Sequence, residues 1–178
     1  EYVYIKIIPH TSTRNYSSIQ VCKTISKLYT NLFKKIHKEQ KKLIIETNFK
    51  FSYIIDMTKD DVSFIFVTPK IYENIVLEKM NESWPKSTFE VLESFQEFNK
   101  DSSYFKLDYK KEDALSLKTD KKLNEPLNSI LSNIEMLKDD DRLTIFYNFM
   151  PENSLGWRER YDETMEKIRK NKVVDKPN

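Results

Sequence analysis

Glycine is almost absent from this sequence, because its 178 residues contain a single one, Gly156. Phosphate-binding loops and dinucleotide-binding fingerprints need several glycines, which allow the backbone to approach the phosphates closely and to adopt positive φ. Neither motif therefore exists in these residues. A complete nucleotide-binding ATPase is excluded for this stretch of chain, although not for a longer protein that contains it.

Other features are equally scarce. The one cysteine, Cys22, cannot form an internal disulfide, which is compatible with a reducing compartment. No apolar run approaches the ~20 residues of a membrane helix, and the first residues resemble a strand rather than a signal peptide. The net charge of +2 argues against a dedicated DNA-binding domain with a strongly basic face. Because the chain starts at Glu1 without a methionine, we expect it to be part of a longer protein.

Signs of catalysis are also missing. His10 and His37 stand far apart and lack the acidic or cysteine spacing of a metal motif, while Cys22 lies on an apolar helix stripe. The acidic clusters at residues 60–61 and 139–141 fall in expected turns and lack EF-hand spacing. There is no G-x-S-x-G elbow. We therefore predict that the chain is not an enzyme and has no catalytic residue, metal site or cofactor.

Hydrophobic periodicity predicts an α+β fold in the first half. Strands are indicated where apolar residues alternate and helices where they recur every three or four positions. The expected order is strand 1–9, helix 17–36 with a basic end, strand 43–56, polar hairpin 57–61, strand 62–68, helix 71–80 and strand 87–95. This β-α-β-β-α-β order is the split pattern of a ferredoxin-like domain, which we assign to residues 1–98.

The second half begins a similar alternation but does not complete it. The expected elements are a strand at 104–110, a short strand and loop within 112–125, a helix at 126–137, a strand ending at Pro151 and a helix at 156–172. We predict a second, incomplete βαβ-type subdomain at residues 99–170 and a tail at 171–178.

The predicted sheet has two chemically different faces. Helices are expected to cover an aliphatic face that carries Val3, Ile5, Ile7, Ile65 and Val67. The other face would then carry Tyr4, Lys6, Phe51, Tyr53, Phe64 and Phe66. Aromatic residues on an open sheet face are the means by which RNA-recognition modules stack bases. However, "DVSFIFVT" lacks the glycine and the leading basic residue of that motif, so covering by the second half of the chain or by a protein partner is the preferred interpretation.

Two segments resemble a known family. The first is "FSYIIDMTKDDVSFIFVTPKIYENIVLEKMNESWPKSTFEVLE", and the second is "LKTDKKLNEPLNSILSNIEMLKDDDRLTIFYNFMPENSLGWRER". The second combines Pro126-Leu127 before a helix, Leu137, an acidic turn at 139–141, a strand ending at Pro151 and the Trp157-Arg158 pair. Over roughly residues 40–165, the chain is similar to large conjugation proteins of Gram-positive plasmids and integrative elements.

This resemblance implies a function and a location. In that family such a region precedes a motor ATPase domain of the coupling or secretion type, often with membrane helices ahead of it. The chain is thus expected to be a non-catalytic assembly or docking domain in type IV secretion-like plasmid transfer, at the cytoplasmic face of the membrane. Its expected partners are other subunits or domains of the complex and a DNA or nucleoprotein substrate, and it would be membrane-associated only through segments outside this sequence. The alternatives are a single-stranded nucleic-acid-binding module that uses the aromatic sheet face, and a small ferredoxin-like enzyme, for which the sequence offers no candidate residues.

Overall fold

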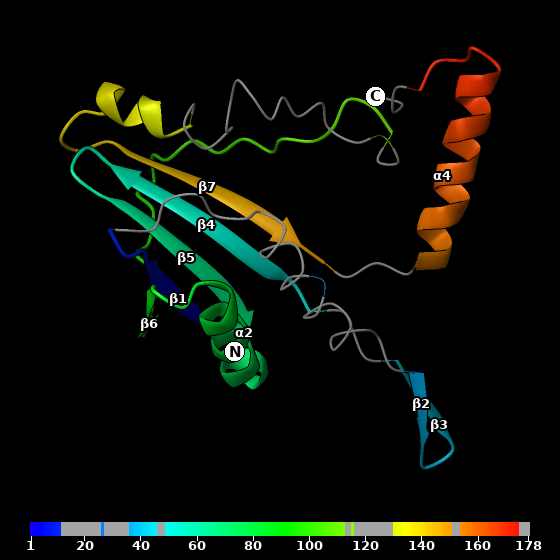
Figure 1. The fold of residues 1–178 in the computed structure, drawn as a ribbon, viewed down its shortest axis with the longest axis horizontal. Helices are drawn as coiled ribbons and strands as arrows, with labels where there is room; N and C mark the ends of the chain where they lie inside the picture. Colours follow the sequence, from blue (N-terminus) through cyan, green and yellow to red (C-terminus); the bar gives the residue numbers. More distant parts are fainter. Residues whose placement is uncertain are drawn as a thin grey trace. The chain divides into compact units, whose positions relative to one another are not determined.

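Five antiparallel strands form the main sheet of this mixed α/β protein, in the order β6-β1-β5-β4-β7 (Figure 1). The computed structural model describes residues 1–11, 26, 36–45, 49–112, 115, 130–150 and 154–174. The strands are β1 Tyr2–Ile8, β4 Phe51–Thr58, β5 Val62–Pro69, β6 Thr88–Leu92 and β7 Arg142–Phe149. The helices are α2 Glu73–Ser83 and α4 Ser154–Arg169, and the 3₁₀ turns are η1 Lys70–Tyr72 and η2 Ser132–Met136. The helix expected at 17–36 lies almost entirely outside the described residues.

The chain divides into two compact units. One contains residues 1–96 and 130–151, and the other contains residues 97–129 and 152–178. The sheet and α2 belong to the first unit, and α4 belongs to the second.

Alternation in β1 explains how the sheet acquires a buried side. Val3, Ile5 and Ile7 are buried, whereas the residues between them are not. Successive side chains of a strand point to opposite faces, so this pattern directs one row into the core, as the sequence predicts. The polar turn after β4 is also confirmed, since the Thr58 amide donates to the Asp61 carbonyl at 2.9 Å.

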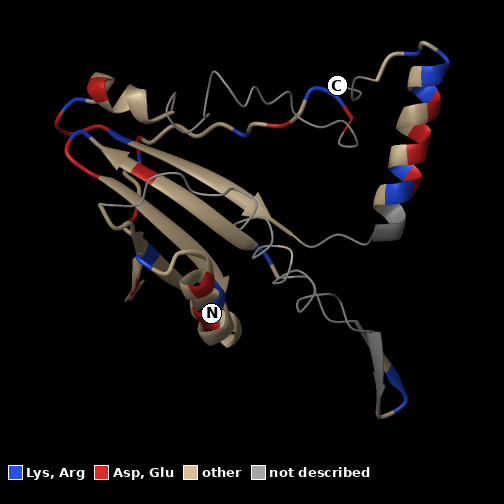
Figure 2. Cartoon of the chain, viewed as in Figure 1, with Lys and Arg blue, Asp and Glu red and all other residues tan. Residues whose placement is uncertain are grey.

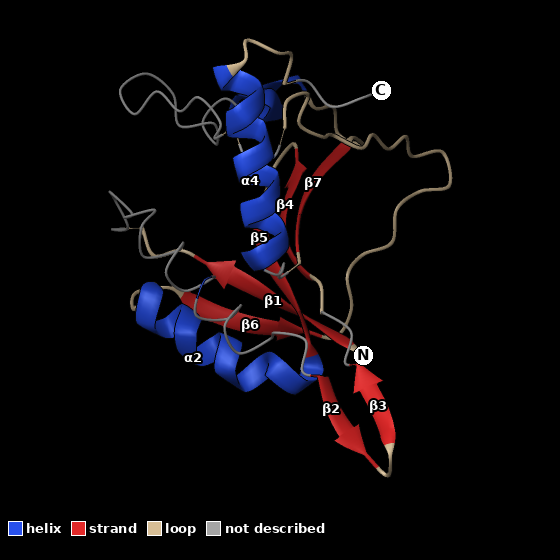
Figure 3. Ribbon diagram, turned by 90° about the vertical axis from the view of Figure 1, so that its right-hand side faces the viewer, coloured by secondary structure: helices blue, strands red, loops and turns tan. Residues whose placement is uncertain are grey.

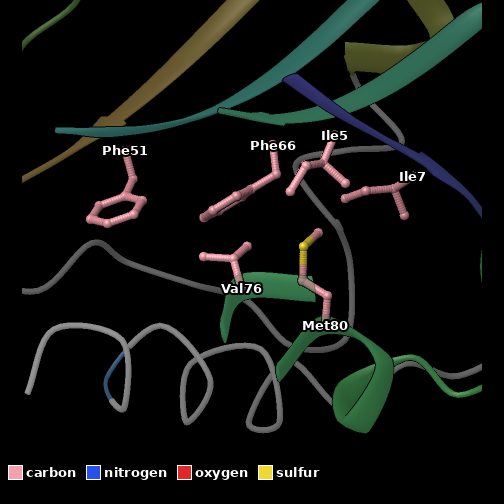
Figure 4. Close-up of a cluster of buried hydrophobic side chains, with 6 residues drawn as sticks. All are labelled: Ile5, Ile7, Phe51, Phe66, Val76 and Met80. Carbon is pink, nitrogen blue, oxygen red and sulfur yellow. The ribbon is translucent and has the colours of Figure 1, made fainter. Parts of the chain in front are cut away.

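Helix α2 packs on one face of the sheet, which we call the α2 face (Figure 3). Its buried residues are Val76 and Met80, which lie four positions apart and therefore on one side of the helix. They face Ile5, Ile7, Phe51 and Phe66 from three strands (Figure 4). The helix ends at Ser83, and Trp84 is its C-cap, because Pro85 disfavours helical conformation in the residue before it.

Strand β7 joins this sheet from far along the chain. It pairs with β4 over eight residue pairs, from Phe51 opposite Phe149 to Thr58 opposite Arg142. The sequence places β7 in the second subdomain, yet its hydrogen-bonding partner belongs to the first. The division of the chain at residue 98 stays a prediction, but β7 is the fifth strand of the main sheet.

Two predicted elements have a different structure. The expected strand at 104–110 forms no strand, and its residues are exposed. The basic end of the expected first helix is instead part of a hairpin, in which β2 Ile36–Glu39 pairs with β3 Lys42–Ile45. Its turn holds Gln40 and Lys41 at φ values of 46° and 66°. This left-handed turn lacks the glycine or asparagine that normally announces it, so the sequence gives no hairpin signal there.

The second unit contains α4, which confirms the helix predicted at 156–172. Trp157 and Tyr161 stack on it with ring centroids 5.3 Å apart, and Lys167 forms an ion pair of 2.8 Å with Glu112. Charges of both signs line α4, whereas the sheet strands carry few (Figure 2). Within the described residues, no helix has the length and apolarity that crossing a membrane requires.

Candidate functional site

The six residues predicted to share one sheet face lie on two faces. Residues that stand directly opposite each other on neighbouring strands share a face of the sheet. Phe66 of β5 stands opposite Ile5 of β1 on one side and opposite Tyr53 of β4 on the other. Phe51, Tyr53, Phe64 and Phe66 therefore lie on the α2 face. Tyr4 and Lys6 lie on the opposite face, together with Ile54, Ile65 and Val67.

The wrong assignment of these residues to one sheet face has a simple physical cause. Alternation within a strand fixes which residues share a face, but it does not fix which face meets the helices. A shift of one residue in the pairing moves every side chain to the other face. Because β5 is buried on both faces, the composition of "VSFIFVT" does not resolve the choice. The prediction that Ile65 and Val67 share a face with Ile5 and Ile7 is therefore wrong.

The aromatic residues of the α2 face form part of the core. Phe51 and Phe66 are 2% and 7% exposed and contact each other at 6.1 Å between ring centroids. Tyr53 stacks on Phe64 and also contacts Tyr147 of β7. Burial, with a smaller contribution from Tyr147, raises the pKa of Tyr53 to about 12. These four rings are packing residues, and Phe51 and Phe66 are too buried to stack on an external ligand.

The opposite face is crossed by the chain that follows β6. Phe95 stacks on Tyr4 of β1 at 5.8 Å and meets Phe146 of β7 edge-on at 6.1 Å. Together with Tyr4 and Leu92, it packs against the buried residues Ile54, Ile65 and Val67. Residues 93–96 therefore run over this face from the β6 edge towards the β7 edge.

An ion pair fixes this crossing segment to the sheet. Arg142 of β7 donates to both carboxylate oxygens of Asp56, through Nε at 2.8 Å and Nη2 at 3.0 Å. Its Nη1 donates to the carbonyl of Gln96 at 3.2 Å, and its guanidinium lies 4.9 Å from the ring centre of Phe95. Thr144 also donates to Asp56, at 2.6 Å. A bidentate, partly buried pair of this kind holds β7, β4 and residues 95–96 in one arrangement.

The outer edge of β7 carries several exposed apolar side chains. Within the described residues β7 pairs with β4 alone, so the backbone groups on its other side have no described strand partner. Leu143, Phe146 and Tyr147 are exposed, and so is Met150 just beyond the strand. We call these four residues with the outer backbone edge the β7 surface. The sequence does carry a signal for it, since "LTIFYNF" places apolar residues at both alternating positions.

Metal-binding side chains do not cluster in the part of the chain that the structure describes. No cluster of three or more His, Cys, Asp or Glu side chains has the proximity to hold a metal ion among the described residues. His10 is exposed after β1, and His37 lies in β2 rather than near a helix end. Cys22 lies outside the described residues.

Comparison with known proteins identifies no relative. No family model matches the chain, and no curated protein or solved structure does either.

Proposed function

We propose that this chain is a non-catalytic docking domain whose β7 surface contacts a neighbouring protein. The observation that carries the proposal is an edge strand with exposed apolar side chains on both of its faces. A strand with an open edge is a template for another chain, and soluble proteins usually protect such edges with lysine, proline or a bulge. Within Arg142–Phe149, β7 contains neither lysine nor proline.

The proposed setting is conjugative DNA transfer of the type IV secretion kind. Its support is the sequence resemblance over roughly residues 40–165. The domain would act at the cytoplasmic side of the membrane, next to a motor ATPase domain of the same parent protein. Its partners would be other domains or subunits of that machinery, and a DNA or nucleoprotein substrate would be handled by the assembly.

The ferredoxin-like architecture is part of this proposal. The strand order β6-β1-β5-β4, with antiparallel neighbours, is the order that a split β-α-β-β-α-β unit requires, and α2 connects β5 to β6. The helix expected between β1 and β4 falls almost entirely outside the described residues. β7 then extends the unit by one strand.

The single-stranded nucleic-acid alternative has less support because the six residues that it needs on one sheet face lie on two. Of the six residues predicted to face a partner or nucleic acid, only Tyr4 and Lys6 lie on the face opposite α2. Tyr4 is already stacked on Phe95. This alternative stays a prediction.

A mating assay tests the docking proposal. Leu143→Asp introduces a charge on the β7 surface, at a side chain that is 37% exposed. Ile71→Asp is the matched control, because Ile71 is an equally apolar residue in η1 and is 72% exposed. In cells carrying the complete transfer genes, we expect Leu143→Asp to lower transfer at least about tenfold, as for loss of an interface anchor, and Ile71→Asp to leave it unchanged.

Circular dichroism of both purified variants provides the folding control. If correctly folded Leu143→Asp protein supports normal transfer, the β7 surface has no docking role.

A further inference from the structure

A short stretch of sequence around the β2–β3 hairpin concentrates positive charge. Residues 34–42, "KKIHKEQKK", contain five lysines and one glutamate, so they carry a net charge of +4. The complete chain carries +2, so the other 169 residues together carry −2. A lysine-rich stretch of this kind in an otherwise slightly acidic chain indicates a local contact with a polyanion.

The structure removes the simplest explanation for these lysines. At the end of the predicted helix 17–36 they would interact favourably with the negative end of the helix dipole. However, Ile36–Glu39 and Lys42–Ile45 are antiparallel strands, and a sheet has only a small net dipole. Glu39 stands opposite one lysine, Lys42, and like charges that lie close together on a short ribbon repel one another. The lysines therefore do not stabilise the hairpin, and an external anion is the partner that their charge fits.

The tip of the hairpin presents this charge at a cost in stability. Lys41 and Lys42 are exposed, and Figure 2 shows the tip in the colour of lysine and arginine. Gln40 and Lys41 have φ values of 46° and 66°, in the left-handed region that favours glycine. A glycine at position 41 would relieve this strain but would remove a charge from the tip. Backbone strain of this kind is concentrated at binding sites.

The shape of the hairpin fits the major groove of duplex DNA. β2 and β3 pair over four residue pairs and with no other described strand. Strands of this length extend over roughly 13 Å. The major groove is about 12 Å wide and about 8.5 Å deep and admits a two-stranded β-ribbon. Phosphates line both of its rims, at one charge per ~1.7 Å of helix axis, so a basic ribbon meets a dense array of negative charge there.

Other polyanions fit the hairpin less well. The tip residues Glu39–Lys42 include no apolar side chain of the kind that membrane-binding elements insert below the lipid headgroups. The major groove of duplex RNA is too deep and narrow for side chains to read. A single strand has no groove to receive a ribbon. Duplex DNA is therefore the polyanion that the charge and the shape favour together.

We infer that the β2–β3 hairpin binds duplex DNA at its major groove, with Lys41 and Lys42 on the phosphates. The contact is made with the DNA backbone, so it is independent of the base sequence. The inference goes beyond the docking function, because the hairpin shares no residue with the β7 surface.

A fluorescence anisotropy titration of the complete 178-residue chain tests this contact. The probe is a labelled DNA duplex of about two helical turns. We expect a Kd of about 1–100 µM at ~0.15 M salt. The logarithm of the binding constant should fall with the logarithm of the salt concentration with a slope of about −3 to −4, as for about four phosphate contacts.

The decisive variant combines Lys41→Gly with Lys42→Gln. It removes two charges, while glycine accepts the positive φ of the turn, so the hairpin is retained. Its salt slope should be smaller by about 2, and its binding at ~50 mM salt should be at least about tenfold weaker. The matched control combines Lys110→Gln with Lys111→Gln, which removes two neighbouring exposed lysines elsewhere in the chain and should bind as the parent does.

Each contrary result overturns the inference. A parent chain that does not bind the duplex at ~50 mM salt excludes a DNA contact of this kind. Equal weakening in the two double variants assigns binding to net charge rather than to the hairpin. A single strand of the same sequence should not bind over the same range of concentration, and equal affinity for it excludes the groove. Vesicles of phosphatidylglycerol are the membrane probe, and binding to them without binding to the duplex makes the ligand a lipid surface.

Failure of this inference is distinguishable from failure of the docking function. Leu143→Asp should bind the duplex as the parent does, because residue 143 lies outside the hairpin. If the hairpin variant binds DNA normally but Leu143→Asp lowers transfer, the DNA contact is wrong and the docking function stands. If the hairpin variant loses DNA binding but Leu143→Asp leaves transfer unchanged, the DNA contact stands and the docking function is wrong.

Discussion

Replacing Arg142 with methionine is expected to loosen the sheet at the junction of β4, β7 and the crossing segment. The substitution keeps much of the aliphatic volume but removes the guanidinium, and with it both hydrogen bonds to Asp56 and the bond to Gln96. The Asp56 carboxylate then keeps only the hydroxyl of Thr144 among the partners described above.

The expected loss is about 3 kcal/mol of unfolding free energy. Breaking a fully buried ion pair costs about 3–5 kcal/mol, because the remaining charge stays desolvated without its partner. The side chains of Arg142 and Asp56 are each 15% exposed, so the lower end of that range applies. For a chain of this size, about 3 kcal/mol corresponds to a fall in Tm of roughly 6–12 °C.

Urea unfolding followed by circular dichroism measures the change, with Lys59→Met as the matched control. Lys59 also pairs with an aspartate of a distant segment, Asp139, but both side chains are largely exposed, at 50% and 82%. That control should lose less than about 1 kcal/mol. The double variant Arg142→Met with Asp56→Leu should be more stable than Arg142→Met alone, because no unpaired carboxylate remains. Two results would refute the reasoning. One is an equal loss of unfolding free energy in Arg142→Met and Lys59→Met, and the other is a loss in the double variant that equals the sum of the losses in Arg142→Met and Asp56→Leu.

Two further predictions concern the aromatic residues. Since the pKa of Tyr53 is raised to about 12, its contribution to stability is complete below the ordinary tyrosine pKa of about 10 and is lost as the pH rises towards 12. Tyr53→Phe should therefore flatten the loss of stability over that interval in urea unfolding at alkaline pH, and an unchanged slope would contradict the assignment. For nucleic acid, we expect no single-strand binding at low salt in a fluorescence anisotropy titration. Binding that falls steeply with salt and weakens in Lys6→Gln would instead favour the alternative function.

The sequence predicts well what depends on neighbouring residues. The alternation of Val3, Ile5 and Ile7 identifies β1 and its buried row, and the Trp84-Pro85 pair marks the end of α2. The polar residues after β4 identify a hairpin. Each of these features is determined by local periodicity or by the conformational limits of one residue, so a single sequence is sufficient to find it.

Features that depend on distant pairing are not predicted. Phe66 pairs with Ile5, which lies 61 residues earlier in the sequence. This register depends on contacts between distant strands, because alternation within one strand is compatible with either face. The recruitment of β7 to β4, and the Asp56–Arg142 pair with it, has no local signal. For this reason the sequence predicts an aromatic sheet face as the candidate site, whereas the structure presents an exposed edge strand.

The late position of β7 in the chain has a consequence during synthesis. The outer edge of β4 emerges from the ribosome about 90 residues before its partner strand is complete, which at ~5–20 residues per second is a delay of roughly 5–20 s. For that time a nascent chain presents a β4 edge flanked by Phe51 and Ile54 with nothing to close it. Truncated products that stop before Arg142 would retain this open edge permanently, so they are the forms of the protein most prone to aggregate and most in need of a chaperone.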